Sequence, residues 1–243
     1  MIEVKKIEYA SVESFLNSIN LISISSEWKS FLEKQYKAKP NFFGIYRGSK
    51  LSFIIPTYDF DNGLELVPKL YGEVIGYDGS GDLPLLEAIQ IITQDKNFKF
   101  LKLSLSFINN PALEKSVSVA KPSQHSVIHV LRVTNESENE ILAQKVSHKT
   151  RNQIKTAYRR GNFTVQLNNN IETFFSFYLK NIKRLGAIAK DRSFFENLKT
   201  SFGGNFHILF AYQGNTLAGA NLVLIKNSYL HLSFNVSRPE FFK

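Results

Sequence analysis

The feature that most constrains the fold of this chain is an internal repeat at an offset of 166 residues. Two stretches align at this offset, in a helix-like segment and in the hairpin-like segment after it: Trp28 and Leu32 meet Phe194 and Leu198, and Y-R-G-S-K-L from Tyr46 meets Y-Q-G-N-T-L from Tyr212. Each copy predicts a helix followed by a strand, a glycine turn and a second strand. We interpret the repeat as a duplicated lobe.

Helical and strand-like patterns alternate along the whole chain, which predicts the α/β (α+β) class. Helices are expected at 10–19, 26–38, 83–94, 171–185 and 192–201, and strands in the segments between them. Ser137 and Glu140 have capping-box spacing and predict a helix start, Ser147 is a second candidate cap, and Gly161 is a candidate helix end. We therefore expect two tandem lobes of mixed sheet flanked by helices, residues 1–135 and 136–243.

The second copy of the repeat is shorter than the first. Residue 243 corresponds to residue 77, after which the first copy continues through a turn, a helix and two strands to about residue 133. A sheet ending there would have an unpaired edge and an uncovered face. We expect the second lobe to be truncated, as the front part of a longer protein or as a piece that a partner completes.

The positive charge of the chain is confined to one quarter of it. The net charge is +9, and residues 145–199 hold 12 Lys and Arg against three Asp and Glu, whereas the remainder holds 18 of each. Such a field attracts phosphates, nucleic acid or anionic headgroups. The absence of cysteine excludes disulfides and thiolate chemistry, and no apolar run indicates a signal peptide or membrane span. These observations predict a soluble, cytoplasmic protein.

The basic excess begins in residues 145–161, K-V-S-H-K-T-R-N-Q-I-K-T-A-Y-R-R-G. Arg151, Lys155 and Arg159 are four residues apart, so they form one stripe of a helix, which Lys149 and Arg160 flank. Ile154, Ala157 and Tyr158 would lie on the other side. The stripe is either a solvated face that keeps the protein soluble or a contact for phosphate or an RNA backbone, and the lack of balancing acids favours the contact.

These residues resemble the basic linker between the lobes of the FemABX transferases and their GNAT-like acyltransferase relatives. In that family a Lys- and Arg-rich helix is followed by Gly and a short strand containing Val. Residues 174–186 resemble the next helix, with Arg184 near its C-terminal end, and 194–198 and 209–224 follow in the family's order. The resemblance covers about residues 140–237, and the first lobe matches only in outline.

The resemblance implies transfer of an acyl or aminoacyl group to an amine. The donor would be aminoacyl-tRNA or acyl-CoA, the acceptor a phosphate-bearing peptidoglycan precursor that could bring the protein to the membrane surface, and no cofactor would stay bound. Arg184 would face the acceptor's phosphates, since a guanidinium binds phosphate oxygens in pairs. Arg160, Lys183 and Tyr178 are secondary candidates, although core packing is the simpler interpretation of Tyr178.

No catalytic residue can be assigned from the sequence. An amine attacks an ester or thioester directly, so the reaction needs no covalent nucleophile. A non-catalytic RNA- or polyanion-binding module that keeps the fold is the alternative. The remaining motifs predict ordinary structure: the glycine-rich segment 76–82 and the acidic segment 59–63 are expected to be turns, and the histidines at 125, 129, 148, 207 and 231 lack metal-site spacing.

Overall fold

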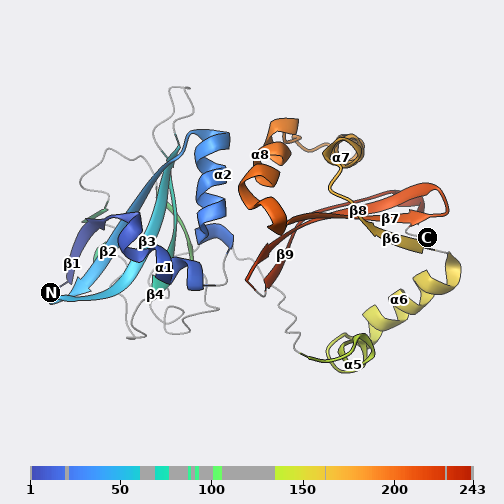
Figure 1. Ribbon diagram of the computed structural model, residues 1–243, viewed down its shortest axis with the longest axis horizontal. Coiled ribbons are helices and arrows are strands. Elements are labelled where there is room, and N and C mark those ends of the chain that lie inside the picture. Colours follow the sequence, from blue (N-terminus) through green and yellow to red (C-terminus); the bar gives the residue numbers. More distant parts are fainter. Residues whose placement is uncertain are drawn as a thin grey trace. The chain divides into compact units, whose positions relative to one another are not determined.

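The computed structural model in Figure 1 describes residues 2–19, 22–60, 69–76, 87–88, 91–92, 101–105, 135–161, 163–227 and 229–241. In space the chain forms two compact units. The first comprises Met1–Lys121, Lys190–Phe206 and Leu224–His231, and the second comprises Pro122–Ala189, His207–Val223 and Leu232–Lys243. The lobe boundary between residues 135 and 136, which rests on the repeat, stays a prediction.

The first half of the chain contains a mixed five-stranded sheet in the order β1-β2-β3-β4-β5 (Figure 1). Its strands are Ile2–Ile7, Lys39–Arg47, Lys50–Phe60, Lys69–Gly76 and Leu101–Leu105. Strands β1 to β4 pair antiparallel, whereas β4 and β5 are parallel. A parallel neighbour requires a long crossover rather than a hairpin.

Helices α1 (Tyr9–Ser18) and α2 (Ser26–Tyr36) accompany this sheet, with the short 3₁₀ turn η1 (Ile22–Ile24) between them. Helix α2 begins where the Ser25 side chain accepts a hydrogen bond from the Trp28 N–H at 3.0 Å. Side chains from α1, η1, β2 and β3 form one buried cluster: Val12, Leu16, Ile24, Phe42 and Ile54. The predicted helices at 10–19 and 26–38 are therefore confirmed, with the second ending two residues early.

The second half contains a four-stranded sheet in the order β6-β7-β8-β9, with strands Phe163–Leu167, Phe206–Gln213, Thr216–Lys226 and Tyr229–Ser237. Four helices precede or interrupt it: α5 (Glu138–Gln144), α6 (His148–Arg160), α7 (Ile171–Leu185) and α8 (Arg192–Phe202). The second half also contains the 3₁₀ turns η3 (Gly203–Asn205) and η4 (Pro239–Phe241). The predicted helices and the three-strand meander after residue 205 are confirmed.

The repeat is visible in the bounds of the elements. Helices α2 and α8 are both 11 residues long and begin 166 residues apart, as do the 11-residue strands β3 and β8. The turns before those strands contain Gly48 and Gly214 in the same left-handed conformation, with φ of 63° and 56°. A side chain in that conformation is strained, which explains the glycine in both copies.

The two equivalent helices also pack against each other. The rings of Phe31 and Phe194 meet edge to face with centroids 5.0 Å apart, and Trp28 approaches Phe202 at 6.5 Å. Asn197 donates a hydrogen bond to the Gln35 side chain at 2.8 Å. Trp28 and Phe194, one of the aligned pairs of the repeat, thus both belong to this aromatic interface.

The glycines that follow α7 and α6 differ in backbone conformation. Gly186 ends α7 with φ of 66°, as its predicted place after the helix requires. Gly161, by contrast, follows α6 with φ of −160°, an extended conformation open to any residue. A Cβ at Gly161 would lie too close to the end of the Gln213 side chain, which would have to move to make room.

Several predictions fall outside the described residues. They are the strand at 126–133, the glycine-rich turn after Gly76, and most of the helix at 83–94, of which 87–88 and 91–92 are helical.

Candidate functional site

Helix α6 carries the basic stretch, α5 precedes it, and each of the two helices begins at a serine. Ser137 accepts a hydrogen bond from the Glu140 N–H, and the Glu140 carboxylate accepts one from the Ser137 N–H at 2.8 Å, which is the predicted capping box. Hydrogen bonds from the Ser137 backbone and side chain lower the pKa of Glu140. Ser147 likewise accepts from the Thr150 N–H at 3.2 Å and starts α6.

Arg151 is occupied by the fold. Its Nη1 donates to the backbone carbonyls of Leu142, Ala143 and Val146 at 3.3, 2.8 and 2.6 Å. Leu142 and Ala143 lie in the last turn of α5, where carbonyls lack partners within the helix, and Val146 follows the helix. Arg151 therefore joins the end of α5 to the first turn of α6 and fixes the corner between the two helices.

Three further cations of α6 are exposed to solvent. Lys149, Lys155 and Arg159 are all exposed. Across the described ranges their side chains make no ion pair or side-chain hydrogen bond, and α6 contains no Asp or Glu. Arg160 is the last residue of the helix. The predicted stripe therefore consists of one structural arginine and free cations beside it.

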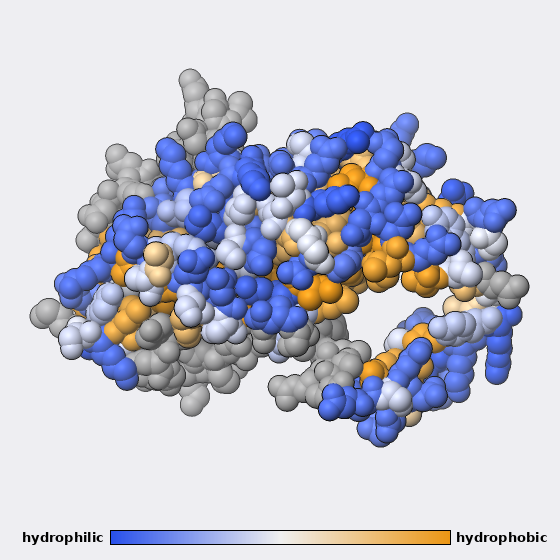
Figure 2. Space-filling view, viewed as in Figure 1, coloured by the Kyte–Doolittle hydropathy of each residue, from blue (hydrophilic) through white to orange (hydrophobic). Residues whose placement is uncertain are grey.

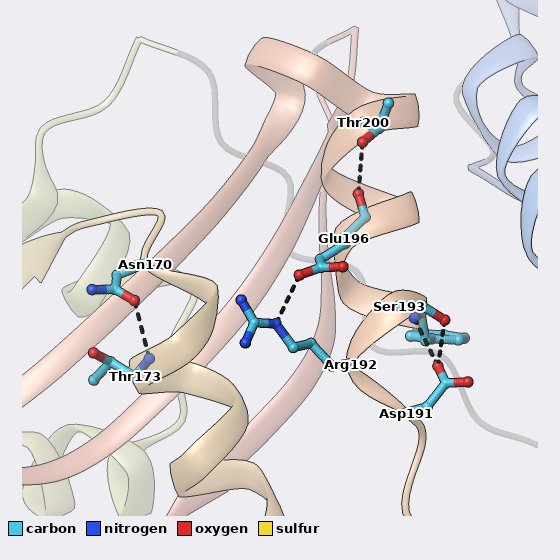
Figure 3. A network of polar contacts seen from close by, with 8 residues as sticks. Asn170, Thr173, Asp191, Arg192, Ser193, Glu196 and Thr200 are labelled. Carbon is cyan, nitrogen blue, oxygen red and sulfur yellow. Dashed lines mark hydrogen bonds and ion pairs between the residues drawn. The ribbon is translucent and has the colours of Figure 1, made fainter.

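Helix α8, in the same basic segment, differs from α6 because it contains an ion pair between an arginine and an acid (Figure 3). Arg192 Nε donates to Glu196 Oε1 at 2.7 Å, one turn further along the helix. Asp191 Oδ1 accepts from the Phe194 N–H at 2.8 Å and so caps the helix, as Asn170 does for α7 by accepting from the Thr173 N–H. Helix α8 thus pairs Arg192 with an acid one turn away, whereas α6 contains no acid.

The side of α6 that carries Ile154, Ala157 and Tyr158 is not buried. Ile154 is half-buried, Ala157 is exposed, and Tyr158 keeps 70% of its surface in solvent. In Figure 2 apolar residues also gather on the sheet strands that border the hollow beside α6. Val165 and Leu167 of β6, both more than 60% exposed, lie on that sheet.

Arg184 and Lys183 occupy the last turn of α7 and are exposed. Both sit at the negative end of the helix dipole, which a cation there stabilises. No hydrogen bond or ion pair joins Arg184 to α6 within the described part of the chain. The structure therefore offers two cationic surfaces in the second unit, one along α6 and one at the end of α7.

Tyr178 belongs to the core. It is 3% exposed, and its ring lies near those of Phe174, Phe175 and Phe234 at centroid distances of 6.0 to 6.4 Å. Packing, the simpler interpretation of this residue, is what the structure shows. Tyr77, His125, His129 and residues 61–63 lie outside the described residues. Within the described ranges, no three His, Asp or Glu side chains gather as a metal site would require.

The sequence patterns did not identify one buried residue, a lysine. Lys226 ends β8 with only 5% of its surface exposed, and its Nζ donates to Asn17 Oδ1 at 3.3 Å and lies 3.9 Å from Glu27 Oε2. The sequence contained a signal for this burial. Lys226 lies an even number of residues after the buried residues Ala218, Ala220, Leu222 and Leu224, so strand alternation places it on the same face of the sheet.

Glu27 responds to this environment. Burial raises the pKa of its carboxyl, but hydrogen bonds from its own backbone N–H and from Ser25, together with the Lys226 charge, outweigh burial. The net result is a lowered pKa. The pair anchors the β8–β9 turn to α1 and α2, and Asn227 adds a hydrogen bond from its side chain to the Asn17 carbonyl at 3.2 Å.

Helices α5 to α8 lie in a segment that matches a known protein family. Residues 114–215, which include α5 to α8, match the FemAB family. Among solved structures, the crystal structure of FemX is similar, with 12% identity, coverage of 98% of this chain and 81% of that chain, and a TM-score of 0.67.

Two other solved structures resemble the chain. A conserved protein of unknown function from Bacteroides thetaiotaomicron has 11% identity, covers 99% of this chain and 82% of that one, and gives a TM-score of 0.52. A tandem GNAT protein from the clavulanic acid biosynthesis pathway has 8% identity, with coverages of 99% and 80% and a TM-score of 0.49. No curated protein sequence matches the chain significantly.

The solved structures show the fold, and the FemAB match lies over the segment that carries the basic helix. The predicted α/β architecture of mixed sheets and flanking helices is thereby confirmed, and so is the resemblance on which the sequence interpretation rested. Residues 114–215 are thus similar to the FemAB family, and the fold of the chain is similar to that of FemX.

Proposed function

We propose that this protein transfers an acyl or aminoacyl group from acyl-CoA or aminoacyl-tRNA to an amine of a phosphate-bearing acceptor, such as a cell-wall precursor. The FemAB match over residues 114–215 and the FemX-like fold support transferase chemistry and a role in building peptidoglycan bridges. The reaction would take place in the cytoplasm, where both kinds of donor are made. Among the described residues, no helix is long and apolar enough to cross a membrane.

One observation carries the proposal, namely the unpaired cations of α6. Lys149, Lys155 and Arg159 are exposed on a helix without acids, inside the segment that matches FemAB. Every donor or acceptor named above carries phosphates, and a focused positive surface raises the local concentration of such substrates. Arg184 is the further candidate contact, because its guanidinium can bind two phosphate oxygens at once.

The chemistry requires little beyond positioning. The amine nitrogen forms a bond to the acyl carbon while the C–S bond of a thioester or the C–O bond of an ester breaks. The amine gives up a proton and the leaving thiolate or alkoxide takes one, so no oxidant or metal is consumed. Holding the two reactants together supplies a large part of such a rate enhancement. We assign no catalytic residue.

The test is a transfer assay on the purified protein with labelled acetyl-CoA or aminoacyl-tRNA and a phosphate-bearing peptidoglycan precursor. We expect label in the precursor's amine with one of these donors. The triple variant K149Q/K155Q/R159Q should raise KM and reduce the dependence of log affinity on log salt by about 2, as loss of roughly three phosphate contacts predicts.

The matched control is the triple variant K6Q/K34Q/K39Q, which removes the same charge from exposed positions of the first half. It should leave both KM and the salt dependence close to wild type. If the protein modifies no amine with either donor, the transferase proposal fails. Salt-dependent binding of tRNA that persists without transfer would instead favour the non-catalytic RNA- or polyanion-binding module.

A further inference from the structure

The loop between α7 and α8 holds the most exposed large apolar side chain among the described residues. Ile188 keeps 96% of its surface in solvent, and Leu185, the last residue of α7, keeps 59%. Leu179, less than two turns earlier on the same helix, is also exposed. A fully solvated isoleucine contributes nothing to the core, so the fold gives no reason for its presence.

Cations surround this apolar tip. Lys180, Lys183 and Arg184 occupy the last turns of α7, and all three are exposed. No acid occurs between Glu172 and Asp191, and Asp191 is already the cap of α8, where it accepts hydrogen bonds from Ser193 and Phe194 (Figure 3). The tip is therefore apolar at its centre and positive at its base.

The tip is also held firmly. Gly186 turns the chain in the left-handed conformation, and the Ala187 N–H donates to the Ile182 carbonyl at 3.2 Å, which closes the end of α7. The opposite face of α7 is anchored, because Phe174 and Tyr178 are buried and Asn181 donates to the Ser237 carbonyl at 2.8 Å. A preformed tip loses little conformational entropy when it binds.

An apolar tip on a cationic base fits the boundary of an anionic bilayer. The acyl region there accepts apolar side chains, and anionic headgroups attract Lys and Arg near the surface. A nucleic acid would satisfy the cations but offers no apolar surface to Ile188 and Leu185. We propose that the α7–α8 loop, residues 185–189, docks this protein on an anionic lipid surface. This inference does not rest on the proposed transfer reaction.

The experiment measures co-sedimentation of the full chain with vesicles of phosphatidylcholine alone and of an equal mixture of phosphatidylcholine and phosphatidylglycerol. We expect binding to the anionic vesicles that weakens as salt rises. The variant I188S should bind about tenfold more weakly, because an isoleucine buried on binding contributes at least a tenfold gain. K180Q should weaken binding severalfold by removing one charge near the surface.

The control is L230S, which replaces another exposed large apolar residue, 61% exposed, outside the loop. It should bind like wild type. A second readout is I188W, whose new tryptophan should show a blue-shifted emission with anionic vesicles, after subtraction of the Trp28 signal of wild type. Because Ile188 is solvated, the thermal unfolding of I188S should match that of wild type.

Three results would overturn the proposal: no binding of wild type to anionic vesicles at low salt, equal binding to neutral vesicles, or equal binding of I188S and wild type. An assay that finds a protein partner for the loop in place of the vesicles overturns it as well. None of these measurements uses the transfer activity, so failure of the proposed function leaves the lipid test unaffected.

Discussion

Helices α6 and α8 both begin at a side-chain cap, but they differ in the burial and charge pairing of their side chains. Both start at a side-chain cap within the basic segment, Ser147 for α6 and Asp191 for α8. Helix α8 buries Phe194, Phe195, Leu198 and Phe202 and pairs Arg192 with Glu196. None of the described side chains of α6 is buried, and its free cations have no acid beside them. Identical rules of helix formation thus serve the core in one helix and an exposed surface in the other.

The largest difference should appear when an aromatic ring is removed from each helix. Phe195 is fully buried, so F195A should destabilise the protein by about 3–5 kcal/mol through lost burial and a cavity. Y158A should change stability by less than about 0.5 kcal/mol, because Tyr158 is exposed. Urea unfolding followed by circular dichroism measures both. A large loss in Y158A would show that α6 is covered and would end the comparison.

Removing the caps sharpens the same contrast. D191A should lower the global free energy of unfolding by about 1 kcal/mol, because the core depends on α8. S147A should cost α6 a similar amount, but only locally, since the helix can open without disturbing buried side chains. Hydrogen exchange should therefore show faster exchange of the α6 amides in S147A while the urea midpoint stays unchanged. A shifted midpoint in S147A would contradict a locally stable α6.

Arg151 and Lys155 separate structure from function within α6 itself. R151Q removes the hydrogen bonds to the Leu142, Ala143 and Val146 carbonyls, so the end of α5 should fray, at a cost of about 1 kcal/mol. K155Q loses no contact and should leave exchange of the α5 amides as in wild type. Equal protection of α5 in the two variants would mean that the corner does not need the guanidinium.

The sequence could predict what depends on neighbours along the chain. Ser137 and Glu140 identified the start of α5, Gly186 the end of α7, and the offset of 166 residues anticipated the equal lengths of α2 and α8. Each of these rests on spacing within about four residues or on the repeat itself. The stripe of cations on α6 likewise followed from helical periodicity alone.

Other features depend on contacts that spacing does not contain. Arg151 caps α5 because two helices meet at a particular angle, and Gly161 lies against the end of the Gln213 side chain from β7. The exposure of Ile188 could not be inferred either, since an isoleucine beside a helix end more often packs inward. The division of the cations into structural and free ones therefore needed coordinates, although their number and helical face did not.

The smallest effect concerns the pair of the buried Lys226 and the half-buried Glu27, and acid should make Lys226 resemble the unpaired cations of α6. The folded pKa of Glu27 lies below its ordinary value of 4.5, so the stabilisation it provides is fully present above pH 4.5. This stabilisation is lost as the pH falls through the lowered folded pKa, where the unfolded state already binds the proton.

The measurement is the difference in free energy of unfolding between wild type and E27Q, obtained by urea unfolding between pH 7 and pH 3. This difference isolates the contribution of Glu27 from that of the other carboxyls. The difference should shrink below pH 4.5, and K226Q should reduce it at neutral pH by removing the charge that helps to lower the pKa of Glu27. A difference that stays constant across this range would mean that Glu27 gains nothing from Lys226 and its capping hydrogen bonds. The paired and unpaired cations of this protein would then be energetically alike.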